Sequence, residues 1–234
     1  MKLYFKPGAC SMASHIVLNE LGLAYTLEQV DTARGVTQTG QRFRDINPGG
    51  YVPALALASG EVITENAAIL EFLADLPAAL GKTAPIQLAP PVASLERTRL
   101  REWLGFLSSE LHKAFSPFFS GVEFSPAARK EAEAKLRKRL SLLEKKLTRS
   151  GDYLLGDRLS VADIYAFVIL NWCQFIGVAL ADWPAAFALW QKIGARPNAI
   201  LAMQQEGLLP EKQTEAAATN SASESLPQNH EEPA

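Results

Sequence analysis

The chain has 234 residues, of which 48% are hydrophobic, 21% charged and 9% aromatic, and its formal net charge is −2. These values are typical of a folded globular protein and unlike those of disordered or collagen-like chains. The balanced charge gives no overall positive field for nucleic acid or an anionic membrane. No apolar run is long enough for a membrane span or a signal peptide. We therefore expect a cytoplasmic protein with no nucleic-acid or membrane partner.

Cysteine and histidine are scarce. The two cysteines, Cys10 and Cys173, are too few for a disulfide framework, and with the three histidines they show no metal-ligand spacing. We expect no metal, and a thiol with a function would have to act singly. Cys173 lies in an apolar run and is interpreted as a core residue.

The first 77 residues alternate short strand-like and helix-like segments. The predicted elements are, in chain order, a strand at 3–5, a helix at 12–21, a strand at 25–30, a hairpin formed by 53–57 and 61–64, and a helix from 65 to about 75. This order predicts an α/β domain over residues 1–77.

A proline-rich stretch at 78–91 has no sustained periodicity and predicts a linker. From 92 to 209 apolar residues recur at helical spacing, which predicts an all-α domain. Its expected helices cover 95–111, 126 to about 149, a buried segment at 164–170 capped by Ser160 and Asp163, and a short stretch after Pro197. Residues 210–234 lack aromatic side chains, and we expect a disordered acidic tail there.

Residues 7–11 (PGACS) place Cys10 between the first predicted strand and the following helix. Backbone N–H groups and the macrodipole at a helix N-terminus lower a thiol pKa, which would activate Cys10. A buried structural cysteine is an equally good interpretation. Ser11 either adds a hydroxyl to the same site or caps the helix. His15 lies about 140° further around the helix, so it is expected to be a surface or packing residue.

Three motifs together resemble the bacterial beta-class glutathione transferases: residues 7–11, 47–55 (NPGGYVPAL) and 64–69 (TENAAI). The resemblance extends over about residues 1–209. It implies a thioredoxin-like domain that binds glutathione and an all-helical domain that supplies an electrophile pocket, the same division that the proline-rich stretch predicts. It also implies glutathione as co-substrate, a small hydrophobic electrophile as second partner, and a homodimer.

The resemblance assigns site roles in the first domain. Cys10 would face the glutathione sulfur, with Ser11 beside it. Tyr51, Val52 and Pro53 would form a cis-proline turn, in which the Val52 backbone pairs with the cysteinyl part of glutathione.

The start of the helix after residue 64 would bind the γ-glutamyl end of glutathione. Glu65 would pair with the ammonium group, and the backbone N–H of Asn66 would receive the carboxylate. Ordinary capping by Thr64 explains the same residues without a ligand. Asn66 stands where serine or glycine is common in the family.

In the helical domain the resemblance places Ser109, His112 and Lys113 over the bound thiol, and Phe115 and Trp172 in the electrophile pocket. In isolation, His112 and Lys113 would be interpreted as surface residues and Trp172 as a core residue.

Gly35, Gly49 and Gly105 stand where members often carry lysine, lysine and asparagine. Each charged hydrogen bond lost would weaken glutathione binding by about 1.5–3 kcal/mol. The sequence predicts a glutathione transferase, and two alternatives stay open. One is thiol–disulfide exchange through Cys10, and the other is a noncatalytic binding or regulatory protein on the same scaffold.

Overall fold

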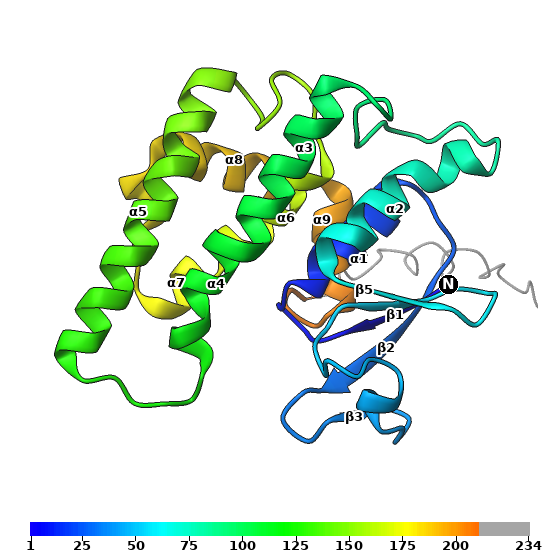
Figure 1. Ribbon diagram of the computed structural model, residues 1–234, viewed down its shortest axis with the longest axis horizontal. Helices are drawn as coiled ribbons and strands as arrows, with labels where there is room; N and C mark the ends of the chain where they lie inside the picture. The colour runs from blue at the N-terminus through cyan, green and yellow to red at the C-terminus, as the bar shows by residue number, and fades with distance from the viewer. Residues whose placement is uncertain (211–234) are drawn as a thin grey trace, which may run out of the picture.

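The structure is a computed structural model that describes residues 1–210. Apart from Pro210, the tail expected at 210–234 therefore lies outside the described residues. Figure 1 shows a sheet with helices against it in the N-terminal part and an assembly of helices in the remainder. The predicted fold class, a thioredoxin-like α/β part followed by an all-α part, is confirmed.

The N-terminal part is built on one five-stranded sheet in the order β3-β2-β1-β4-β5. The first strand runs parallel to the second and antiparallel to the fourth, which brings fully buried Leu3 and Leu55 opposite each other. The third strand is too short to give a period-two pattern and is not among the predicted elements. The strands are β1 (Lys2–Phe5), β2 (Thr26–Asp31), β3 (Val36–Thr37), β4 (Ala54–Ala56) and β5 (Val62–Thr64).

Two helices, α1 (Ser11–Glu20) and α2 (Asn66–Ala79), accompany the sheet, with a short 3₁₀ turn, η1 (Phe43–Asp45). Nearly every residue of α1 is buried, because β1, α2 and two helices of the C-terminal part all pack against it. The helix α2 continues beyond the predicted end near 75 and includes Pro77 in its last turn.

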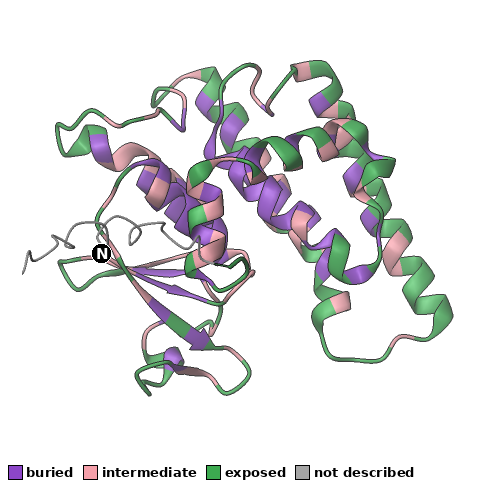
Figure 2. Ribbon diagram, turned by 180° about the vertical axis from the view of Figure 1, so that it is seen from behind, coloured by how far each residue is buried: buried purple, intermediate pink, exposed green. Residues whose placement is uncertain are grey.

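The C-terminal part is entirely helical. Its centre is α6 (Val161–Asn171), in which residues 161–170 are all buried, as Figure 2 shows. The helix α8 (Pro184–Gly194) is not among the predicted helices. The remaining elements are α3 (Leu95–Phe106), the π-helical turn η2 (Leu107–Leu111), α4 (His112–Phe115), η3 (Ser116–Phe119), α5 (Pro126–Ser150), α7 (Cys173–Ile176), η4 (Leu180–Asp182), α8 (Pro184–Gly194) and α9 (Pro197–Gln205). No helix in the described part of the chain is long and apolar enough to cross a membrane.

The predicted capping role of Asp163 is confirmed. Its carboxylate accepts hydrogen bonds from the backbone N–H and hydroxyl of Ser160, at 2.8 and 2.6 Å, and from the N–H of Leu154 at 2.7 Å. Burial raises the pKa of Asp163 to about 6, although these hydrogen bonds oppose the rise. The residue therefore fixes the start of the central helix and the loop before it. Cys173 is buried, as expected.

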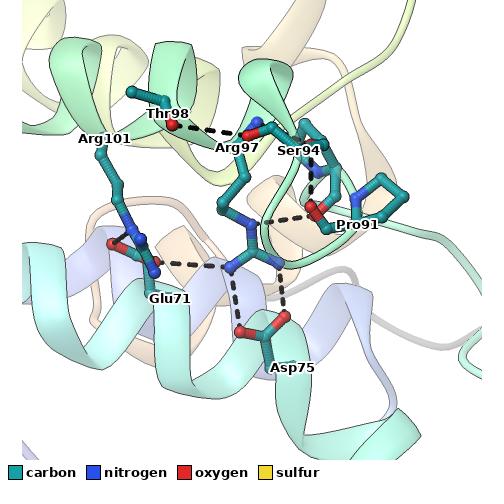
Figure 3. Close-up of polar contacts among 8 residues, drawn as sticks. Glu71, Asp75, Pro91, Ser94, Arg97, Thr98 and Arg101 are labelled. Carbon is teal, nitrogen blue, oxygen red and sulfur yellow. Dashed lines mark hydrogen bonds and ion pairs between the residues drawn. The ribbon is translucent and has the colours of Figure 1, made fainter.

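A buried guanidinium joins the two parts (Figure 3). The Arg97 side chain, 2% exposed, donates from both terminal nitrogens to Asp75 and from Nε to the carbonyl of Pro90 at 2.9 Å. Its Nη1 also lies 3.4 Å from Glu71, which Arg101 contacts as well. The ion pairs hold α2 against α3, and the bond to Pro90 anchors the chain that connects them.

The variant Asp75→Ala is expected to lower the thermal unfolding midpoint more than Glu102→Ala. A buried charge deprived of its partner costs up to about 3–5 kcal/mol, a cost that Glu71 reduces here by remaining near Arg97. The exposed Arg99–Glu102 pair on the same helix contributes about 0.2–1 kcal/mol. Each kcal/mol corresponds to about 2–4 °C for a chain of this size. If calorimetry gave the same unfolding midpoint for Asp75→Ala and Glu102→Ala, a structural role for this cluster would be contradicted.

Candidate active site

Cys10 occupies the turn between β1 and α1, where three segments meet. Its Sγ donates a hydrogen bond to the carbonyl of Val52 at 3.2 Å. Its own carbonyl accepts a hydrogen bond from Nδ2 of Asn66, the first residue of α2, at 3.1 Å. The thiol turn, the proline turn and the start of α2 are thus in direct contact around Cys10.

The pKa of Cys10 agrees with the interpretation of a buried cysteine and not with activation by the helix N-terminus. Burial raises the pKa of Cys10 to about 12, while the backbone N–H groups at the helix start and the charge of Lys113 lower it less strongly. Desolvation disfavours the thiolate more than the helix N-terminus favours it. In the free protein Cys10 is a neutral thiol that acts as a hydrogen-bond donor.

The peptide bond between Val52 and Pro53 is cis, as the resemblance predicts. Nδ2 of Asn47 donates to the carbonyl of Tyr51 at 2.7 Å and holds the preceding turn. Tyr51 itself is 75% exposed, and Nζ of Lys113 lies 6.0 Å from the centroid of its ring. The proline turn therefore extends an exposed aromatic ring toward the helical part.

Glu65 precedes α2 in a backbone conformation that side chains rarely adopt. Its φ is 66°, in the left-handed region, and its exposed side chain makes no capping hydrogen bond. Strain of this kind persists where the surrounding structure over-determines it, often at functional sites. Glu65, and not Thr64, occupies the cap position. Capping by Thr64 is therefore wrong, and the first N–H groups of α2, from Asn66 and Ala67, are suited to an anion.

His112 follows directly after the π-helical turn, which changes the direction of the residues after it relative to a regular helix. Nδ1 of His112 lies 2.9 Å from the hydroxyl of Tyr165, and its ring centroid lies 4.8 Å from that of Trp172. Burial, and then the charge of Lys113, lowers the pKa of His112 to about 4. The half-buried imidazole is therefore neutral near pH 7.

The aromatic residues predicted for the electrophile pocket are mostly buried. Trp172 is 6% exposed, and its Nε1 donates to the carbonyl of Gly8 at 2.9 Å. Phe115 is fully buried, with its ring centroid 5.6 Å from that of Trp172. Phe119 is 51% exposed and lies against both rings, at 6.5 Å from Phe115 and 5.9 Å from Trp172. Phe119, which is not among the predicted residues, thus offers the accessible aromatic face.

Two hydroxyl groups predicted for the site, those of Ser11 and Ser109, form hydrogen bonds with backbone groups. Oγ of Ser11 accepts from the N–H of Lys6 at 3.2 Å and donates to the Lys6 carbonyl at 3.3 Å, so Ser11 ties the end of β1 to α1. It makes no capping hydrogen bond to the helix. Oγ of Ser109 donates to the carbonyl of Gly105 at 2.8 Å.

His15 is fully buried, so of the two expected roles, surface or packing, the packing role is confirmed. Nδ1 of His15 lies 2.9 Å from Oε1 of Glu206, which follows α9. Oε2 of the same carboxylate accepts from the N–H of Gly8 at 2.9 Å. Glu206 therefore links the end of the helical part to the turn that carries Cys10. No local motif marks Glu206 in the sequence, because its partners lie nearly the whole chain away.

Two of the three unusual glycines have a local structural reason. Gly35 has a φ of 69°, which a lysine would adopt only with strain. At Gly49 a Cβ atom would lie 3.2 Å from Oδ1 of Asn47, so the Asn47 side chain would have to move by a few tenths of an ångström. Among residues 1–210 no group of three or more His, Cys, Asp or Glu side chains could hold a metal ion.

Alkylation of Cys10 by iodoacetamide is expected to be slow at pH 7 and to accelerate as the pH rises toward 10. The thiolate is the reacting species, and the raised pKa of Cys10 leaves little of it near neutrality. Peptide mass spectrometry would follow Cys10 separately from Cys173, with an unstructured cysteine peptide as reference. A rate at pH 6 above that of the reference peptide would show a stabilised thiolate and contradict the structure.

The comparisons with known proteins divide the chain into the same N-terminal and C-terminal parts as the structure. The family model for the glutathione S-transferase N-terminal domain matches residues 8–76, and the model for the C-terminal domain matches residues 106–197. Glutathione S-transferase GstA of Escherichia coli O157:H7 is 37% identical over 211 residues, which cover 89% of this chain and 100% of GstA.

Two solved structures are similar over 89% of this chain and 100% of their own. The beta-class glutathione S-transferase of Sphingomonas chungbukensis is 42% identical, with a TM-score of 0.81. A sphingomonad glutathione S-transferase complexed with glutathione is 44% identical, also with a TM-score of 0.81. The chain belongs to the glutathione S-transferase family and is similar throughout its described length to the bacterial beta class.

Proposed function

We propose that this protein activates the thiol of glutathione for attack on a small hydrophobic electrophile. The observation that carries this proposal is the junction at Cys10, where the proline turn and the start of α2 are hydrogen-bonded to the same residue. The strained, exposed Glu65 lies at the start of that helix. The glutathione complex of the sphingomonad relative supports the same ligand.

Glutathione would bind across the three segments that meet at Cys10. The Glu65 carboxylate would pair with the γ-glutamyl ammonium group, while the N–H groups of Asn66 and Ala67 receive the carboxylate. The backbone of Val52 would pair with the cysteinyl part, as an added strand does. This pose brings the glutathione sulfur to Cys10, with Lys113 approaching from the helical part.

A neutral Cys10 suits the task of stabilising another thiolate. On glutathione binding its S–H would turn from the Val52 carbonyl to the glutathione sulfur, which lowers the pKa of that thiol. The glutathione proton leaves to solvent. The thiolate then forms a carbon–sulfur bond with the electrophile, and the leaving group departs with its bonding electron pair. Phe119, with Trp172 behind it, would hold an apolar or aromatic electrophile.

Reduced glutathione is expected to raise the thermal unfolding midpoint of the wild-type chain in a saturable manner. Ligand at 100 times its Kd adds about 2.7 kcal/mol, or about 5–11 °C at this size. Glu65→Ala should abolish most of the shift, because the ammonium group loses its partner. Glu61→Ala, an exposed carboxylate nearby, is the matched control and should retain it.

The same titration distinguishes the alternatives. Cys10→Ala should still bind glutathione and should lose most turnover of an aromatic electrophile. Loss of disulfide exchange alone, with conjugation intact, would favour a thiol transferase. The absence of any midpoint shift at millimolar glutathione would overturn the proposal and favour a noncatalytic binding protein.

We also propose that the protein assembles as a homodimer. A groove between α3 and α5 supports this assembly. Trp103, Phe106 and Leu142 form its apolar part, and Leu142 is 49% exposed. The rest of its lining is charged: Glu102, Lys145, Lys146 and Arg149. Light scattering should give twice the chain mass, and Leu142→Glu should shift the mass toward that of one chain, because a charge would have to be buried at the interface. A wild-type mass equal to one chain would contradict the assembly.

A further inference from the structure

The proposed pose gives bound glutathione a direction along the proline turn. Strands β4 and β5 are antiparallel, with Ala54 opposite Thr64. The same register, continued by one residue, places Glu65 beside Pro53. A ligand whose γ-glutamyl end is at Glu65 and whose cysteinyl part pairs with Val52 therefore runs antiparallel to the turn. Its glycyl end extends past Val52 toward the residues before it, away from the start of α2.

A guanidinium group lies against this part of the turn. It belongs to Arg44 of η1, whose Nη1 donates a hydrogen bond to the carbonyl of Pro48 at 2.9 Å. A Cβ atom at Gly50 would lie 3.2 Å from Cζ and 3.3 Å from Nη2 of Arg44. The glycine at position 50, whose φ is 74°, thus leaves room for the guanidinium beside the backbone. The turn carries a positive charge in this way, although position 49 is itself a glycine.

The Arg44 guanidinium keeps donors for a ligand. Its N–H groups form a planar fork that matches the two oxygens of a carboxylate. Among the described residues its hydrogen-bond partner is the Pro48 carbonyl, and no carboxylate pairs with it. Arg42, two residues earlier, instead lies 4.0 Å from Asp45. The bond to Pro48 restricts the Arg44 side chain before a ligand arrives, so less conformational entropy is lost on binding.

A second cation at the turn has a different place. Nζ of Lys113 lies 6.0 Å from the ring centroid of Tyr51, and its charge lowers the pKa of Cys10. That ammonium group therefore acts at the thiol. Arg44 instead contacts Gly50, two residues before the residue that pairs with the cysteinyl part. The two cations suit two different groups of one ligand, its sulfur and its glycyl carboxylate.

We propose that Arg44 binds the glycyl carboxylate of glutathione, with its guanidinium bridging that group and the Pro48 carbonyl. The inference rests on the proposed function for the identity of the ligand. Hydrogen bonds between two charged groups are stronger than those between neutral groups. Arg44 touches no reacting atom, so it contributes affinity and not chemistry. The thiol substrates selected in this way carry a free carboxylate one residue beyond the cysteinyl part, which γ-glutamylcysteine lacks.

The variant Arg44→Gln tests this assignment. It removes the charge and keeps an amide that can donate to the Pro48 carbonyl. Arg44 is exposed, and isothermal titration calorimetry on the full, reduced chain should show the Kd of glutathione raised by about five- to tenfold. The glycyl monoethyl ester of glutathione lacks only that negative charge. The ester should bind the wild-type chain as weakly as glutathione binds the variant, and Arg44→Gln should leave the Kd of the ester unchanged.

Turnover gives a second measurement. In steady-state assays with an aromatic electrophile, Arg44→Gln should raise the half-saturating glutathione concentration and leave kcat within about twofold, because the contact is the same in the ground and transition states. Arg44→Lys keeps the charge and loses the planar fork, so its Kd for glutathione should lie between those of the wild-type chain and Arg44→Gln.

Arg42→Gln is the matched control. Arg42 is exposed, precedes the same 3₁₀ turn and faces Asp45, so the variant should leave the Kd of both ligands unchanged. Wild-type affinity of Arg44→Gln for glutathione would overturn the inference, and so would an equal loss of affinity for glutathione and for its ester. Failure of the proposed function would be seen separately, as the absence of a glutathione-dependent midpoint shift in the wild-type chain.

Discussion

The position of the thiol depends on the two hydrogen bonds of Gly8. Its N–H donates to Glu206 and its carbonyl accepts from Trp172, each at 2.9 Å, so the helical part holds this peptide on both sides. The φ of 69° at Gly8 is readily accessible only to glycine. Cys10 follows two residues later and can reach Val52 and Asn66 only from this turn. Packing between the two parts is therefore a condition for forming the site as well as for stability.

The features predicted correctly from sequence are those that local chemistry determines. The capping carboxylate at Asp163 lies three residues from Ser160, and the period of the apolar residues gives most helices and strands. Residues whose role depends on distant partners could not be assigned. The Cys10 pKa follows burial by the whole fold, and Tyr165 looks like one more core residue in an apolar run. The sequence signal for a polar role of Tyr165 was its hydroxyl group within an otherwise apolar run. The cis peptide bond before Pro53 could be predicted only from the family resemblance.

Asn66 shows how one substitution changes the use of a position. Its backbone N–H remains at the start of α2, where an anion can bind, while its side chain bonds Ser14 and the Cys10 carbonyl in the interior. At position 35 the positive φ explains the glycine, and at position 49 the nearby Asn47 side chain explains it. In the proposed complex, the recognition of glutathione therefore depends on backbone groups and on Glu65 more than on added lysines.

The contact of Glu206 with Gly8 also has a consequence for synthesis. The two residues are 198 positions apart. The sheet and α1 can begin to fold while the ribosome is still adding the helices, since domains generally fold as units from the N-terminus. The Cys10 turn, however, lacks one of its two supports until α9 has emerged. A chain interrupted before Glu206 would carry the complete N-terminal part with an incompletely fixed thiol turn, so the turn that carries Cys10 is completed late in translation.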